Sequence, residues 1–78
     1  MAGFIRQSPP VRQFTAPLRG RENFVTAESH KIRKITDVYI LDGNGVEISV
    51  SYVIQPQLDV VVNSLIDLTG FTIYISGT

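Results

Sequence analysis

The chain has 78 residues, a formal net charge of zero, 44% hydrophobic residues and no cysteine. A chain of this length forms one small domain at most, and it buries only about 60–65% of its unfolded surface. Without cysteine it can hold neither a disulfide nor a thiolate metal site. We therefore expect association with other chains to supply part of its stability.

Targeting and membrane signals are not predicted. No apolar run approaches the roughly 20 residues that a membrane-spanning helix requires. Pro9, Pro10 and Arg12 lie where the apolar core of a secretory signal peptide would fall. The first 21 residues hold four arginines and no acid, as mitochondrial transit peptides do, but three prolines interrupt the amphipathic helix that such peptides form. These patterns argue against membrane insertion, secretion by a signal peptide and mitochondrial import.

Charge is segregated along the chain. Residues 1–34 carry all seven Lys and Arg residues and two acids, a net charge of +5 (seven less two). Residues 35–78 carry five acids and neither Lys nor Arg, a net charge of −5. Such asymmetry is typical of an interaction arm joined to a separate body. We predict an extended, basic, proline-containing arm over residues 1–30 and a folded body over residues 31–78.

The arm shows neither the twofold alternation of a strand nor the period of a helix. Its prolines favour extended or polyproline conformations, and one short strand within residues 23–27 is the exception that we expect. An extended arm suits docking on partner protein subunits, because it offers backbone hydrogen bonds, apolar contacts and arginine side chains that can pair with carboxylates. The predicted contact residues of the arm are Phe4, Ile5, Arg6, Val11, Arg12, Phe14, Leu18, Arg19, Arg21 and Phe24.

The body begins with a predicted hairpin. Residues 35–41 are rich in β-branched and aromatic side chains, which predicts a strand. The sequence Asp-Gly-Asn-Gly follows at residues 42–45 and is a strong turn signal, because Gly and Asn tolerate positive φ. Residues 46–54 alternate between apolar and polar and form the predicted return strand. The first strand is apolar on both faces, which is typical of a central strand.

A helix and a last strand are predicted after the hairpin. Pro56 suits the first turn of a helix, and Gly70 suits the position just after its end. Between them, Leu58, Val61, Val62, Leu65 and Leu68 follow helical spacing. Residues 71–76 alternate and form the last strand. With a right-handed crossover, the fold class is α+β: a β-β-α-β body with a three-stranded sheet of order 2-1-3 and one helix on one face, preceded by the extended, irregular N-terminal arm.

The second face of this predicted sheet has nothing in the body to cover it. Contiguous apolar surface on so small a domain marks an interaction site. Either the arm folds back over the face or another chain covers it. The last strand, which carries neither charge nor proline, is expected to be an open edge that pairs with a neighbour. The predicted partner-binding residues of the open sheet face are Val38, Ile40, Val53 and Tyr74.

Reactive side chains do not converge in the sequence. His30 is the one histidine, and we expect it to be solvated. Asp59 and Asp67 roughly share a face of the predicted helix and are also expected to be solvated. Residues 42–45 resemble the start of a calcium loop but lack its further ligands. We therefore expect no catalytic residue, no cofactor, no metal site and no small-molecule substrate, and the protein is not predicted to be an enzyme.

These features predict a non-enzymatic structural or assembly protein, a minor subunit whose arm docks on neighbouring subunits, copies of itself included. The plan of a basic arm and a small body is similar to that of minor subunits in virus particles, especially bacteriophage heads and tails. The expected location is therefore the virion or the host cytoplasm. Two alternatives stay open: a nucleic-acid-associated accessory protein whose arm contacts phosphates, and a small regulator that dimerises through the open sheet face.

Overall fold

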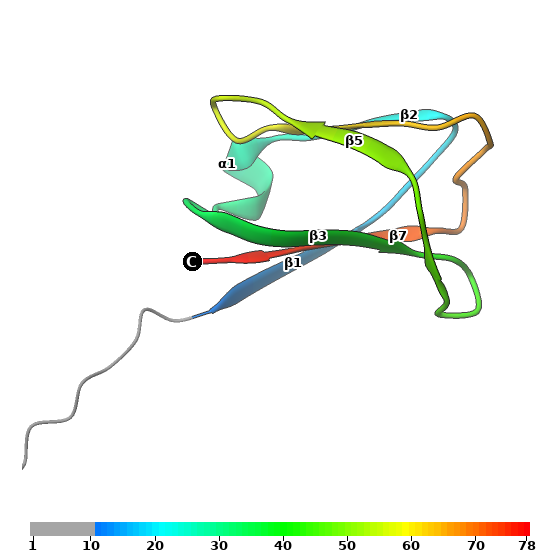
Figure 1. Cartoon of the computed structure of the whole chain (residues 1–78), viewed down its shortest axis with the longest axis horizontal. Helices are drawn as coiled ribbons and strands as arrows, with labels where there is room; N and C mark the ends of the chain where they lie inside the picture. The colour runs from blue at the N-terminus through cyan, green and yellow to red at the C-terminus, as the bar shows by residue number, and fades with distance from the viewer. Residues whose placement is uncertain (1–10) are drawn as a thin grey trace, which may run out of the picture.

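Seven strands and one short helix form within residues 11–78, the part of the chain that the computed structural model describes (Figure 1). Sheet A has the strand order β1-β7-β3-β4, sheet B has the order β2-β6-β5, and all neighbours are antiparallel. In this part of the chain no helix is long and apolar enough to cross a membrane. The elements are β1 (Arg12–Pro17), β2 (Glu22–Val25), α1 (Ala27–His30), β3 (Ile35–Leu41), β4 (Glu47–Ile48), β5 (Ser51–Ile54), β6 (Val60–Asn63) and β7 (Thr72–Gly77).

The predicted α+β fold with a three-stranded sheet and one covering helix is wrong. The segment expected to be that helix forms a turn, strand β6 and a loop. Val60, Val61 and Val62 are consecutive β-branched residues, whose restricted χ1 angles favour a strand. Pro56 lies in the tight turn between β5 and β6, where the N–H of Leu58 donates to the carbonyl of Gln55 at 2.7 Å. The chain therefore forms two antiparallel sheets that pack on each other.

The extended, irregular arm predicted as part of that fold is also wrong for residues 12–22, whereas the short strand expected within residues 23–27 overlaps β2 (Glu22–Val25). Strand β1 pairs with β7, and β2 pairs with β6. Pro17 is tolerated because β1 is an edge strand of sheet A. On the open side of an edge strand, a missing N–H removes no interstrand hydrogen bond. Leu18 and Val25 are buried in the core with exposed fractions of 2% and 7%. This part of the chain folds back, but it extends both sheets instead of covering a face.

The predicted hairpin is confirmed in part: its first strand and its turn form, but only two residues of the return strand pair with the first strand. Strand β3 spans the expected residues and pairs with β4 across the turn. The N–H of Asp42 donates to the carbonyl of Val46 at 2.9 Å, and the Asp42 carboxylate accepts from the N–H groups of Asn44 and Val46. Gly45 has a φ of +81°, which the turn requires and glycine permits. The return strand, however, is not continuous: it breaks after β4 and resumes as β5 in sheet B.

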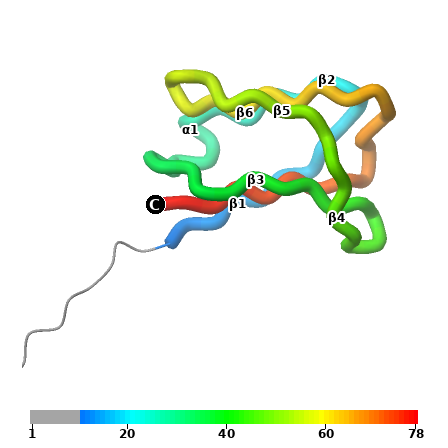
Figure 2. The backbone as a smooth tube through the Cα atoms, in the orientation of Figure 1, coloured from blue at the N-terminus to red at the C-terminus, as the bar shows by residue number. Residues whose placement is uncertain are grey.

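Four segments pass from one sheet to the other (Figure 2). Residues 18–21 connect β1 with β2, residues 26–34 connect β2 with β3, residues 49–50 connect β4 with β5, and residues 64–71 connect β6 with β7. The first segment is held by the loop before β7, since Leu18 N–H donates to the Phe71 carbonyl at 2.9 Å and Leu68 N–H donates to the Gly20 carbonyl at 2.8 Å. The core between the sheets consists of Leu18, Val25, Ile32, Val38, Ile40, Val60, Val62, Leu68, Ile73 and Ile75.

His30 is buried at 5% exposure, so its expected solvation is wrong. Helix α1 is a single turn that Thr26 caps, and His30 is its last residue. The Nδ1 atom accepts a hydrogen bond from the N–H of Ile32 at 2.9 Å, and Nε2 lies 2.7 Å from the carbonyl oxygen of Leu58. A carbonyl can only accept, so Nε2 carries the proton and donates it. The ring therefore joins α1 to the β5–β6 turn.

Candidate functional site: an open groove between the sheets

The acidic residues have separate structural roles. Asp59 and Asp67 lie beyond opposite ends of β6, so they do not share a face. Asp59 Oδ1 accepts a hydrogen bond from the N–H of Ala27 at 2.7 Å. Asp67 Oδ1 accepts from the N–H and the hydroxyl of Thr69 at 2.9 and 2.6 Å. Over residues 11–78, no group of three or more His, Cys, Asp or Glu side chains is placed to hold a metal ion.

The Asp67 carboxylate stabilises the loop that precedes β7. Hydrogen bonds from the hydroxyl and N–H of Thr69 hold the pKa of Asp67 below its ordinary value, and the N–H of Gly20 and the charge of Arg21 act in the same direction. Because the folded pKa lies below the unfolded one, this stabilisation is complete above the unfolded pKa. It is lost as the pH falls through the folded pKa. We therefore assign Asp67 to turn formation.

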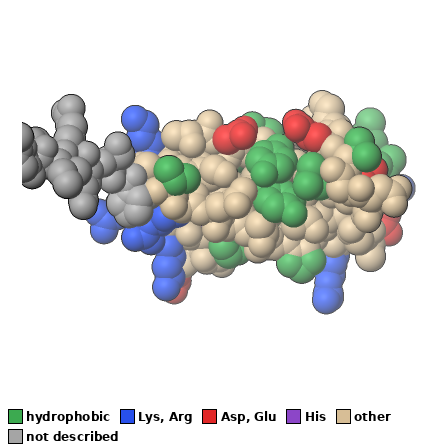
Figure 3. Space-filling view, turned by 90° about the horizontal axis from the view of Figure 1, so that it is seen from below, with side chains coloured by type: hydrophobic (Ala, Val, Ile, Leu, Met, Phe, Trp, Pro, Cys, Tyr) green, Lys and Arg blue, Asp and Glu red, His purple; other side chains and the backbone are tan. Residues whose placement is uncertain are grey.

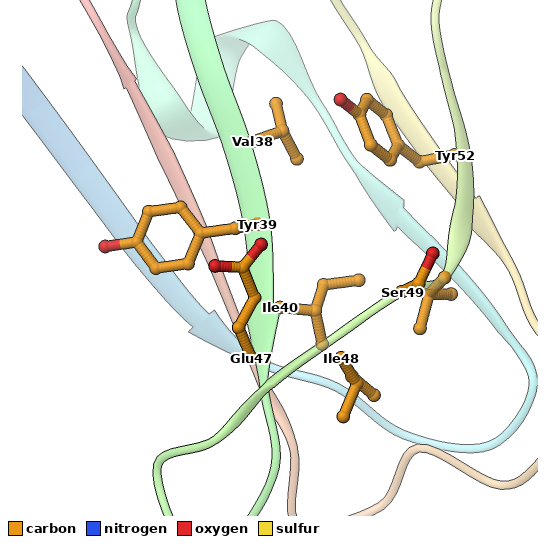
Figure 4. A pocket seen from close by; sticks show the side chains of 8 residues that line it. Val38, Tyr39, Ile40, Glu47, Ile48, Ser49 and Tyr52 are labelled. Carbon is orange, nitrogen blue, oxygen red and sulfur yellow. The ribbon is translucent and has the colours of Figure 1, made fainter.

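A groove opens between β3 of sheet A and β5 of sheet B (Figure 4). It arises because the chain leaves sheet A after β4, which pairs with β3 only at Ile40 and Leu41. Beyond these two residues, no strand within residues 11–78 pairs with that edge of β3. The groove has a cavity volume of about 330 Å³. Its lining residues are Val38, Tyr39, Ile40, Glu47, Ile48, Ser49, Val50 and Tyr52.

Strand β5 forms the other rim and exposes all four of its side chains. Tyr52 and Ile54 pair with the buried residues Val62 and Val60, so they project toward the inner side of sheet B. They nevertheless stay 42% and 39% exposed. Figure 4 shows Tyr52 and Val38 on opposite walls of the groove. The groove therefore exposes side chains that would belong to the core if another strand covered them.

The apolar surface continues over the outer side of β5. Val61 of β6 lies between Val53 of β5 and Phe24 of β2, and the register places the three directly across from one another. Val53 and Phe24 are 58% and 59% exposed. Both sides of the β5 edge are thus apolar, and the strand carries neither charge nor proline. A strand edge of this kind accepts a further strand readily.

The outer face of sheet A carries a pair of stacked tyrosines. Tyr39 and Tyr74 are direct neighbours on β3 and β7, and their rings stack with centroids 4.9 Å apart and an interplanar angle of 2°. Gln13 of β1 donates a hydrogen bond to the Tyr39 hydroxyl at 3.3 Å. Figure 3 shows this side of the molecule, with a hydrophobic patch near its centre and acidic side chains beside it. This face combines polar and apolar side chains, and its tyrosines already contact each other and Gln13. The groove differs in this respect.

The four residues predicted to share an open sheet face do not share one. Val38 and Ile40 are buried in the core, at 8% and 2% exposure. Tyr74 lies on the opposite side of sheet A, and Val53 belongs to sheet B. The last strand is not an edge either, because β7 lies between β1 and β3. Val38, Ile40 and Val53 nevertheless lie around the groove, the first two in its lining and the third on β5.

The predicted arm residues are dispersed by the fold. Leu18 is a core residue, and Phe14 is half-buried with its ring edge-on to His30 at 6.4 Å. Val11 and Phe24 are exposed. Arg12 lies on β1, whereas Arg19 and Arg21 are exposed at the bend between β1 and β2. Phe4, Ile5 and Arg6 lie outside the described residues.

A second, wider cleft lies at the end of the domain where β1 begins. It has a cavity volume of about 740 Å³, and three cations, Arg12, Lys31 and Arg33, contribute to its lining.

No protein-family model, curated protein or solved structure matches this chain. The groove and this basic cleft are therefore the candidate functional sites within residues 11–78.

Proposed function

We propose that this chain is a non-enzymatic structural subunit that joins a larger assembly by accepting an extended protein segment in the groove between β3 and β5. The exposure of the inward-facing Tyr52 and Ile54 beside an unpaired strand edge carries the proposal. An added strand gains main-chain hydrogen bonds from such an edge and specificity from alternate side chains. Covering Tyr52, Val53 and Ile54 would contribute about 2–4 kcal/mol in total from apolar burial.

The assembly that we propose is a virus particle, and specifically a bacteriophage head or tail. The segregation of charge, +5 over residues 1–34 and −5 over residues 35–78, supports this choice, since complementary charges on neighbouring subunits favour their contact. A small core contributes little stability to a chain of this size. Contacts with partner subunits would add to that stability. The open groove is consistent with a subunit whose surface is completed on assembly.

Replacing Tyr52 with lysine tests the proposal, because it places a charge on the rim of the groove. We expect the Tyr52→Lys variant to be incorporated into the native particle at least tenfold less than wild type, as a loss of about 1.4 kcal/mol predicts. The measurement is quantitative mass spectrometry of sedimented particles. The matched control is Leu65→Lys, which changes a 93%-exposed residue outside the groove lining. Equal incorporation of the two variants, both folded, would refute the proposal.

A second candidate function, nucleic-acid binding, is favoured by the basic cleft. Arg12, Lys31 and Arg33 line it, and Lys34 follows directly in the chain. Four phosphate contacts would make the logarithm of the affinity for duplex DNA fall with the logarithm of salt concentration at a slope of about −3 to −4. Replacing Arg33 and Lys34 with alanine would make that slope shallower by about 2. Absence of binding to DNA and RNA at low salt would remove this candidate.

A further inference from the structure

We propose that the segment occupying the groove is residues 1–10 of a second copy of the chain, so that copies join head to tail. This inference rests on the proposed function and names its partner. The groove needs a segment with apolar side chains that can lie extended, and residues 1–10 contain the adjacent apolar residues Phe4 and Ile5.

The N-terminal segment joins the domain away from the groove. Arg12 lies opposite Gly77, which in turn lies opposite Ile35, so the chain enters β1 at the end of sheet A where β3 begins. Strand β1 and the groove lie on opposite sides of β7 and β3. Ten extended residues span at most about 33–36 Å. This is longer than the roughly 13 Å that the four residues of β5 occupy, so the segment can fill the groove and still leave a connection.

The composition of the segment matches both sides of the β5 edge. Phe4 and Ile5 are adjacent apolar residues, and adjacent side chains of a strand point to opposite faces. One of them would therefore enter the groove beside Tyr52, while the other would extend the row formed by Val53, Val61 and Phe24. A segment with a single apolar face would leave one side of β5 uncovered.

The charges of the segment and the groove are complementary. Residues 1–10 contain Arg6 and no acid. Glu47 of β4 is the charged residue in the lining of the groove. Opposite charges at the rim favour this segment over an acidic one and fix its position along the groove.

The groove of another copy is favoured over the segment's own groove. To reach its own groove, the segment would have to reverse direction just before β1 and then cross the ends of β7 and β3. Pro9 and Pro10 occupy that point of the sequence. Proline fixes φ and restricts the residue before it to extended conformations, which disfavours a tight reversal. Contact between copies is then heterologous, which generates closed rings or open filaments.

Sedimentation velocity of the full chain over a range of concentrations tests the inference. We expect wild type to form concentration-dependent oligomers, and Ile5→Asp and Tyr52→Lys each to sediment as monomers. The matched control, Leu65→Lys on the domain, should oligomerise like wild type. An equimolar mixture of Ile5→Asp and Tyr52→Lys should give dimers and nothing larger, because one intact segment meets one intact groove and the remaining ends are blocked.

Each contrary result has a defined meaning. Wild type that stays monomeric up to millimolar concentration overturns self-association, while the incorporation experiment still decides the proposed function. Oligomers that survive Ile5→Asp but not Tyr52→Lys overturn the choice of segment. A mixture that remains monomeric overturns the head-to-tail contact. Circular dichroism establishes that Tyr52→Lys is folded, and Val53→Lys on the same strand replaces it if it is not.

Discussion

Replacing Gly77 with alanine is expected to lower the free energy of unfolding by on the order of 3 kcal/mol. Gly77 is buried near the end of β7, between Arg12 of β1 and Ile35 of β3. A Cβ atom there would overlap the backbone carbonyl of Lys34 and lie 2.6 Å from a methyl carbon of Ile32. The carbonyl cannot rotate away as a side chain could, because Lys34 and Thr78 hydrogen-bond to each other in both directions at 3.0 Å.

Thermal unfolding followed by circular dichroism measures this effect. A loss of that size corresponds to a decrease in Tm of roughly 12–24 °C in a domain of 60–100 residues. The control is Gly43→Ala, since the nearest atom to a Cβ at Gly43 is a carbonyl oxygen 3.9 Å away. We expect that control to change stability by about 0.5 kcal/mol or less. Similar Tm values for the two variants would contradict the prediction. They would mean that the backbone around Gly77 shifts to accommodate a Cβ atom.

Replacing His30 with alanine is expected to cost about 2–3 kcal/mol. The change removes the acceptor of the Ile32 N–H and the donor to the Leu58 carbonyl, and each polar group left unpaired in the interior costs about 1–3 kcal/mol. It also removes the edge-on contact with Phe14. Because the ring joins α1 to the β5–β6 turn, its loss weakens the attachment of that turn to the rest of the domain.

Chemical denaturation of His30→Ala measures the loss, with Arg33→Ala as the control. Arg33 is exposed, and its backbone bond to Thr78 is retained in the control. Nitrogen NMR of the His30 ring adds an independent test. The geometry requires the neutral ring with its proton on Nε2, and a proton on Nδ1 would contradict the two hydrogen bonds as assigned.

The hairpin could be predicted because its signals are local. The turn at residues 42–45 needs only its own residues, since Asp42 accepts hydrogen bonds from two N–H groups within four residues and Gly45 adopts positive φ. Strand β3 could likewise be predicted from its β-branched and aromatic content. Local chemistry of this kind does not depend on where the rest of the chain lies.

The arm and the helix were predicted wrongly because their structure depends on distant partners. Strand β1 contains Pro17 and has no clear alternation, and it becomes a strand by pairing with β7 at the far end of the sequence. The valines of β6 satisfy helical spacing as well as a strand, and pairing with β2 and β5 selects the strand. Leu65, assigned to the apolar face of that helix, is 93% exposed instead.

The candidate site could be predicted only in part. Apolar residues on a small domain indicated an interaction surface, and Val53 was among them. The position of the groove depends on the break between β4 and β5, for which Ser49 and Val50 give no strong signal. Val53, an apolar residue on the otherwise polar face of its strand, was the one local sign that β5 has apolar surface on both sides.

The pairing of β1 with β7 also has a consequence for how the chain folds during synthesis. Strand β1 cannot pair within sheet A until β7 is present, because β7 lies between β1 and β3 and pairs with both. A nascent chain lacking β7 would expose the unpaired edges of β1 and β3 together with the residues that later form the core. Folding governed by such sequence-distant pairing is slow, on the order of milliseconds to seconds. The completed domain therefore forms only after β7 has been translated.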